Sequence, residues 1–184
     1  FRFRVTKTVK FDEPSVYHLY YGDKDGTPGS IMTYFPFPDI ARGRPGTGEV
    51  GTTVFSVPEG ALGYWQQRLI EARVGDITPG ESFGQKRLGF RGPDGDGLAL
   101  VEVPGDARAP WTGNGVAADE AIRGFHSASL RLADGGATES LLRFMGYEAS
   151  EQHEGIKRFV LPGWNGPDLV DIGTLAEVAR SGRG

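Results

Sequence analysis

The sequence predicts an α+β fold in which short strands form curved mixed sheets and helices are few. The first observation is the density of turns: the 184 residues include 29 Gly and 12 Pro, several of them in turn dipeptides such as Asp25-Gly26 and Asn165-Gly166. Such dipeptides indicate many short elements joined by tight turns. The second observation is the pattern between the turns, where apolar and polar residues alternate with period two in runs rich in Val, Phe, Tyr and Thr.

The expected elements can be placed in chain order. Strands are predicted at residues 1–9, 16–21, 30–35, 50–57, 86–90, 98–103, 124–132, 156–161 and 169–172. Helical spacing is confined to two stretches. These are residues 61–71, with Leu62, Trp65 and Leu69 on one stripe, and residues 137–145, with Ala137, Leu141 and Met145 on another.

The order of these elements repeats within the chain. Strand, helix and then two or three strands occur from residue 50, and the same order returns from residue 123, with Thr53 aligned to Ala128. A repeat of this kind predicts tandem βαβββ modules. We therefore divide the chain into residues 1–49, 50–103, 104–122, 123–174 and 175–184. The first range is expected to hold the last strands of one module plus a loop. The second and fourth are expected to be complete modules, the third a linker and the last an exit segment towards a further module.

Composition excludes several classes of function. Lys and Arg number 20 against 24 Asp and Glu, and no long block of like charge occurs, so we expect no nucleic-acid partner and no anionic membrane partner. The chain has no Cys, which excludes disulfides and thiolate metal sites and fits a reducing compartment. No apolar run approaches the length of a membrane span. These observations favour a cytoplasmic protein.

Six short motifs point to a family. They are VTKTVKFD at 5–12, YHLYYGD at 17–23, GTPG at 26–29, VPEG at 57–60, GPDG at 92–95 and IRGFH at 122–126. In this order they resemble the hydroquinone-type ring-cleaving dioxygenases of the glyoxalase, bleomycin-resistance and extradiol-dioxygenase superfamily, also called the vicinal oxygen chelate superfamily. The resemblance covers nearly the whole chain, but it matches only the central part of such enzymes.

The resemblance implies a fold and a chemistry. Members hold a divalent metal, Fe(II) or Mn(II), with two His and one Glu from the first and fourth of four modules, and they open a hydroquinone-like ring with dioxygen. Such a ligand face leaves open positions on the metal for ring and dioxygen. It also implies that modules one and four form the metal barrel and that modules two and three form a second, supporting one.

None of the three family ligands has a counterpart in this chain. The resemblance therefore implies that this chain alone holds no metal and is inactive, and it assigns no catalytic residue here.

Substrate-pocket candidates follow from the same resemblance. Overlaying the strand after Gly29 on the ligand-bearing strand of module four puts Tyr34 where the metal-binding Glu would lie, with Tyr20 across from it. Alternation along the strands then predicts that His18, Tyr20, Met32 and Tyr34 point inward. The alternative interpretation is a barrel core whose polar tips are satisfied.

The supporting barrel has a polar pair of its own. His126 and Asp171 fall at ligand-equivalent positions of the third module, but the equivalent residues of the second module are Gly51 and Val101, which cannot bind a metal. We therefore expect a hydrogen bond between His126 and Asp171 inside the core, as a structural pair or a vestigial site.

Two other functions stay open at this point. One is a non-catalytic module of the bleomycin-resistance type, whose concave sheets bind an aromatic ligand without metal. The other is isomerisation of the lactoylglutathione lyase type, although the motifs favour ring cleavage. Incomplete modules leave sheet edges that pair with other strands, so a homo-oligomer is also an option.

Overall fold

The computed structural model describes residues 4–10, 17–23, 25–27, 30–37, 41, 43–163 and 168–175. Up to residue 18 it describes the backbone alone. The predicted exit segment 175–184 lies outside the described residues except for Leu175.

The main body is an eight-stranded mixed sheet with the strand order β5-β6-β7-β4-β8-β11-β10-β9. Its first half contains β4 (Glu49–Val57), α1 (Leu62–Glu71), β5 (Thr78–Ser82), β6 (Gln85–Arg91) and β7 (Gly97–Glu102). Its second half contains β8 (Gly124–Leu132), α2 (Gly136–Phe144), β9 (Glu148–His153), β10 (Ile156–Val160) and β11 (Leu169–Thr174). A short 3-10 turn, η1 (Gly113–Gly115), lies in the connection. Each half thus has the order strand, helix, three strands.

The two halves are joined by β4 and β8, which pair antiparallel with Thr53 opposite Ala128. These are the two residues that the sequence repeat aligned, so the halves meet about an approximate two-fold axis. Within each half the first strand also pairs in parallel with the last, β4 with β7 and β8 with β11. The eight strands form one continuous sheet, and the ranges 50–103 and 123–174, as modules two and three of a joint barrel, remain our interpretation.

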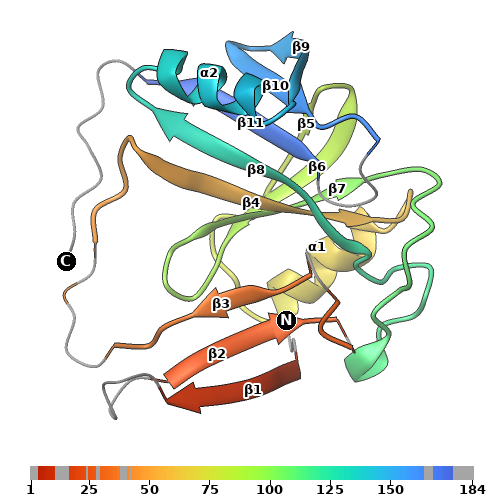
Figure 1. Cartoon of the computed structure of the whole chain (residues 1–184). Helices are drawn as coiled ribbons and strands as arrows, with labels where there is room; N and C mark the ends of the chain where they lie inside the picture. Colours follow the sequence, from red (N-terminus) through yellow and green to blue (C-terminus); the bar gives the residue numbers. More distant parts are fainter. Residues whose placement is uncertain are drawn as a thin grey trace.

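A second, three-stranded antiparallel sheet has the order β1-β2-β3. Its strands are β1 (Arg4–Lys10), β2 (Tyr17–Gly22) and β3 (Met32–Tyr34). Figure 1 shows this sheet as a separate layer below β4 and α1. Met32 packs against the hydrophobic core that contains Phe55 and Leu98, which ties the small sheet to the α1 side of the large one.

The core lies between the large sheet and its helices. Trp65 and Leu69 of α1 are buried against Phe55, Leu88 and Leu100, as the predicted stripe of the first helix requires. The stripe predicted for the second helix is wrong: the buried residue of α2 is Leu142, whereas Ala137, Leu141 and Met145 are exposed.

Two strands were missed by the sequence analysis. These are β5 and β9, which form the two outer edges of the large sheet. Their sequences, TPGES and EASEQH, lie mostly exposed to solvent. They contain no alternating apolar residues because an edge strand of this kind packs nothing on either face.

Candidate functional site

The register of β2 and β3 separates the predicted pocket residues onto two faces. Leu19 lies opposite Tyr34, Tyr20 opposite Thr33 and Tyr21 opposite Met32. Residues directly opposed in an antiparallel pair share a face. The expectation that Tyr20 points the same way as Met32 and Tyr34 is therefore wrong, because the pairing differs by one residue from the one assumed. The side chain of His18 lies outside the described part of the structure.

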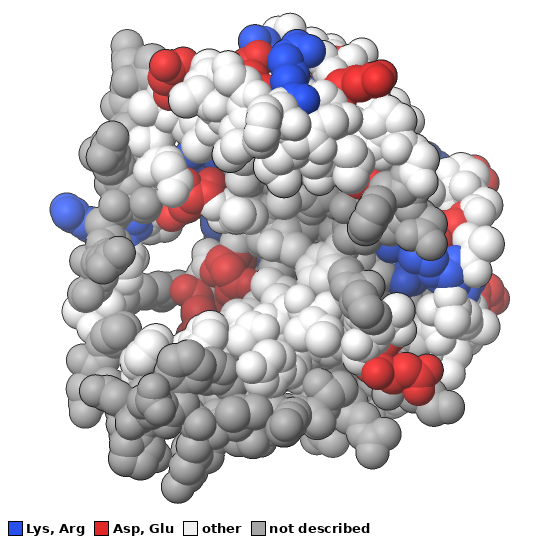
Figure 2. Space-filling view, in the orientation of Figure 1, with Lys and Arg blue, Asp and Glu red and all other residues white. Residues whose placement is uncertain are grey.

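Met32 and Tyr34 line a cavity of about 240 Å³ between the two sheets. The other lining residues are largely apolar or aromatic: Leu19, Tyr21, Phe35, Pro36, Phe55, Pro93, Asp94 and Leu98. Figure 2 shows the hollow between the two layers, with acidic side chains at its wall. An apolar cavity with a few polar groups has the general character of a small-molecule pocket.

Tyr34 is fixed at the wall of this cavity. Its hydroxyl donates a hydrogen bond to Asp96 Oδ2 at 3.1 Å, and its ring meets that of Tyr21 edge-on at 5.5 Å. Burial and the neighbouring Asp96 carboxylate raise the pKa of the Tyr34 hydroxyl above its usual range. Tyr34 is thus a neutral phenol that attaches β3 to the turn between β6 and β7.

The opposite face of the large sheet is concave. Arg158 on β10 contacts Gln85 at the start of β6 with 3.4 Å between Nη1 and Oε1, although the two strands lie far apart in the sheet order. Its guanidinium also lies 3.7 Å from the centre of the Phe83 ring, at the turn before β6. These contacts require the sheet to curl until β6 and β10 approach each other across this face.

Asp171 is bound by Arg158 rather than by His126. Arg158 donates from Nε to Oδ1 at 2.7 Å and from Nη2 to Oδ2 at 2.9 Å, and both residues are buried. The predicted hydrogen bond between His126 and Asp171 is therefore wrong: both carboxylate oxygens already accept from a guanidinium, which matches them in geometry and carries a charge. Arg158 was missed, although it lies directly opposite Asp171 in the antiparallel pair.

His126 is buried close to these charges but bonds elsewhere. Its Nδ1 lies 3.2 Å from Ser127 Oγ. Burial, reinforced by Arg158, lowers the pKa of the His126 imidazole to about 4, so the ring is neutral at physiological pH.

Gly51 and His126, the two positions that the family resemblance compares with metal ligands on β4 and β8, both lie at β-bulges. The pairing of β4 with β8 passes over Gly51 on one strand and His126 on the other. A bulge inserts an extra residue and redirects a side chain. At Gly51 the space that a side chain would need is filled by Arg131. No group of three or more His, Asp or Glu side chains able to hold a metal occurs among the residues that the structure describes.

Known proteins resemble this chain in both sequence and structure. MhqO of Bacillus subtilis, provisionally named a ring-cleaving dioxygenase, is 36% identical over 183 residues, which is 98% of this chain and 56% of MhqO. The chlorohydroquinone/hydroquinone 1,2-dioxygenase of Sphingobium indicum is 36% identical over 143 residues, 76% of this chain and 44% of that enzyme. A crystal structure of a provisionally named dioxygenase from Bacillus subtilis superposes with a TM-score of 0.88 at 35% identity, over 97% of this chain and 57% of that one.

In sequence and in fold the chain is thus similar to proteins that are named as ring-cleaving dioxygenases. It spans about half the length of the curated relatives it matches. Glyoxalase I of Zea mays shares the fold, with a TM-score of 0.63 at 12% identity over 98% of this chain and 62% of that one. No protein-family model matches the chain.

The duplicated strand–helix–strand order and the curled sheet are thus features of a fold that this chain shares with glyoxalase I. Within the described ranges, neither α1 nor α2 nor any other helix has the length and apolar character needed to cross a membrane.

Proposed function

We propose that this chain is the central portion of a metal-dependent dioxygenase that opens a hydroquinone-like aromatic ring with dioxygen. The observation that carries the proposal is the 36% identity to a chlorohydroquinone/hydroquinone 1,2-dioxygenase over 76% of the chain. The alternative of a non-catalytic module of the bleomycin-resistance type is not favoured, because the similar proteins are named as dioxygenases.

The residues of this chain do not fit a metal centre of their own. Both oxygens of Asp171 already accept hydrogen bonds from Arg158, and His126 has no second imidazole or free carboxylate beside it among the described residues. In the proposal the metal, Fe(II) or Mn(II), is held by the rest of the protein, and this chain supplies a wall of the substrate pocket and a rigid support.

The pocket wall belongs to the small sheet. One face of β2 and β3 carries Met32 and Tyr34 and is packed towards the large sheet. The other face carries Tyr20 and Thr33 and turns away from it. We assign Tyr20 to the substrate side, and Tyr34 and Met32 to the support behind it. His18 stays a substrate-pocket candidate on the sequence pattern alone.

The proposal includes the setting of the enzyme. It would be cytoplasmic, would form a homo-oligomer through its sheet edges, and would bind a small aromatic substrate and dioxygen but no nucleic acid.

Oxygen uptake by the complete protein that contains this chain tests the proposal. After loading with Fe(II), the protein is expected to consume oxygen with hydroquinone and to produce a ring-opened compound. Protein treated with a chelator is the control for spontaneous oxidation. A complete protein that opens no dihydroxybenzene ring would contradict the assignment.

A further inference from the structure

Two arginines occupy equivalent places in the two halves of the large sheet. Arg87 on β6 lies directly opposite Val101 on β7, and Arg158 on β10 lies directly opposite Asp171 on β11. The two members of each pair share a face, because they are directly opposed. Arg87 also interacts electrostatically with Asp171 and Arg158, which places both pairs on the concave face. One difference between the two halves concerns charge: Asp171 lies opposite Arg158 in one half, whereas Val101 lies opposite Arg87 in the other.

Arg87 has no partner of its own. Among the described residues its guanidinium makes neither a hydrogen bond nor an ion pair, since both oxygens of Asp171 accept from Arg158. Burial lowers the pKa of Arg87, and the charge of Arg158 adds to this effect while Asp171 opposes it. The concave face thus holds two guanidinium groups beside one buried carboxylate, that of Asp171, while Glu151 contacts Arg158 from an exposed position. His126, on the same face, is neutral.

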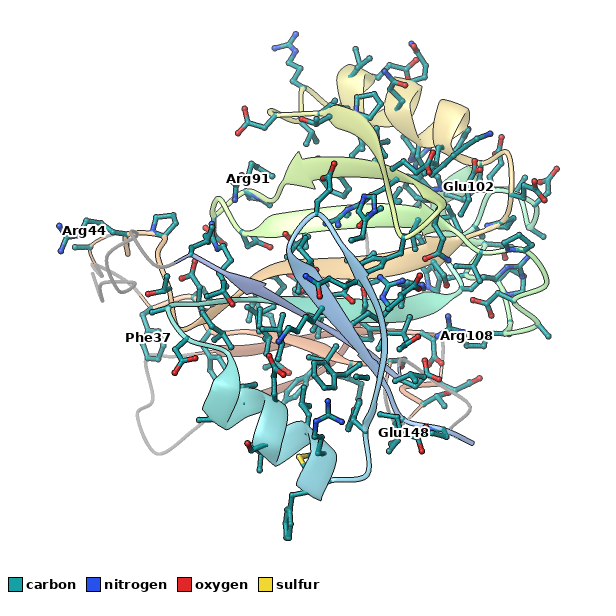
Figure 3. All side chains as sticks on the ribbon, turned by 90° about the horizontal axis from the view of Figure 1, so that it is seen from above. Phe37, Arg44, Arg91, Glu102, Arg108 and Glu148 are labelled. Carbon is teal, nitrogen blue, oxygen red and sulfur yellow. The ribbon has the colours of Figure 1, made fainter. Side chains whose placement is uncertain are left out.

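The other arginines near this face are each matched with an acid. Arg108 is paired with Asp106 at 2.6 Å, Arg131 with Glu49, and Arg91 with Asp76 at 3.8 Å. Figure 3 shows Arg91 and Arg108 at opposite ends of the strands. Arg87, between these ends, is the exception among them. A mostly buried cation without a counterion is costly unless an anion accompanies it.

Space for such an anion lies beside Arg87. A cavity of about 410 Å³ is lined by Arg87, and three neighbouring strands contribute glycines to its wall, Gly51, Gly89 and Gly97. At Gly51 and Gly97 neighbouring atoms occupy the space that a side chain would need, whereas the backbone of Gly89 is left open to a ligand. Thr52 also lines the cavity and carries a hydroxyl group that can hydrogen-bond an oxyanion, whereas the hydroxyl of Thr78 donates to the carbonyl oxygen of Asp76.

We propose that Arg87 is the principal ligand of an anion site on this concave face, which binds a small molecule through its carboxylate or phosphate group. The other half of the sheet shows the mode of binding, because Arg158 holds the Asp171 carboxylate with two parallel hydrogen bonds. The buried side chain of Val101 fills the position directly opposite Arg87, so the ligand of Arg87 lies beside it, in the cavity lined by Gly89 and Gly97. The site is independent of the proposed ring-cleaving centre.

Calorimetric titration of the protein with sodium benzoate and, separately, with inorganic phosphate at constant ionic strength tests the site. Binding of either anion to the wild type is expected, and the anion that binds identifies the group recognised. The Arg87→Gln variant should bind at least about tenfold more weakly, because a charge-assisted bidentate contact is lost. Lys86→Gln is the matched control: it removes the same charge from the adjacent position, whose exposed side chain points to the opposite face, and should keep the wild-type affinity.

The proposal is overturned if the wild type binds neither anion, if Arg87→Gln binds as tightly as the wild type, or if Lys86→Gln loses as much affinity as Arg87→Gln.

A second variant tests the geometry without a free ligand. Val101→Asp places a carboxylate opposite Arg87, as Asp171 lies opposite Arg158. This variant should fold and lose anion binding. Arg87→Gln should reduce the free energy of unfolding more in the Val101→Asp variant than in the wild type. Equal effects of Arg87→Gln in both backgrounds would show that Arg87 does not face this place.

Discussion

At the scale of single residues, the pair of Arg158 and Asp171 decides the character of the concave face. Both are buried, so each depends on the other for a counterion. The sequence pointed to Asp171 and His126 but not to Arg158, because the face of an arginine in the short strand Ile156–Val160 depends on strand register. His126 was assigned the wrong partner for a related reason: it lies at a bulge, and simple alternation does not predict bulges.

Removal of the Asp171 charge should destabilise the protein strongly. Asp171→Asn leaves Arg158 buried without its anion, and the expected loss is about 3–5 kcal/mol of unfolding free energy. Glu151→Gln is the control, because Glu151 is an exposed partner of the same arginine at 3.8 Å and should cost less than about 1 kcal/mol. Urea denaturation measures both. Equal losses would contradict the assigned role of Asp171.

Stability should also depend on the protonation of His126. The pKa of this imidazole is about 4 in the folded protein and about 6.5 in an unfolded chain. Between these values the unfolded state binds more protons, so stability rises with pH in this window and is lost as pH falls from about 6.5 towards 4. Burial raises the pKa of Asp106, but hydrogen bonds to Arg108 and Ser56 outweigh burial and hold it at about 2. Titration of Asp106 therefore affects stability only below this window.

Unfolding free energies at pH 7 and pH 5 measure the effect of His126. The expected difference is on the order of 1–2 kcal/mol. His126→Gln should reduce this difference, whereas His153→Gln, at a partly exposed position, should keep it. An unchanged pH dependence in His126→Gln would show that another group is responsible.

At the scale of elements, strand register decides which way a side chain points, and composition alone does not predict it. Nearly all buried strands were predictable because their alternating residues face a core, and the helix at residues 61–71 was predictable for the same reason. Strands β5 and β9 were not, since their polar residues are compatible with a loop. The same limit affected the pocket: β2 and β3 were expected, but their pairing, which places Tyr20 and Tyr34 on opposite faces, could not be read from either strand alone.

Tyr34 should therefore act mainly on stability. Tyr34→Phe removes the hydrogen bond to Asp96, a carboxylate whose Oδ1 is buried without a hydrogen-bond partner. The expected loss is about 1–2 kcal/mol. Thr33→Val, at an exposed position on the other face of β3, is the control and should change little. Thermal unfolding of both variants checks this, and identical melting temperatures would exclude an anchoring role for Tyr34.

At the scale of the whole molecule, the internal repeat carried most of the correct prediction. Aligning Thr53 with Ala128 anticipated the central pair of strands across which the halves join. What the repeat could not anticipate is where the halves differ: Val101 against Asp171, and Gly51 against His126. These differences leave Arg87 without a carboxylate in one half and give Arg158 one in the other, so the symmetric fold carries an asymmetric inner face.

The central claim, that this chain is part of a ring-cleaving dioxygenase, is tested most directly by isotope labelling. The complete protein, loaded with Fe(II), is supplied with hydroquinone under ¹⁸O₂, and the product is examined by mass spectrometry. The account predicts a ring-opened acid that carries an oxygen atom from dioxygen in its carboxyl group. A quinone with its ring intact and no label from dioxygen would contradict it.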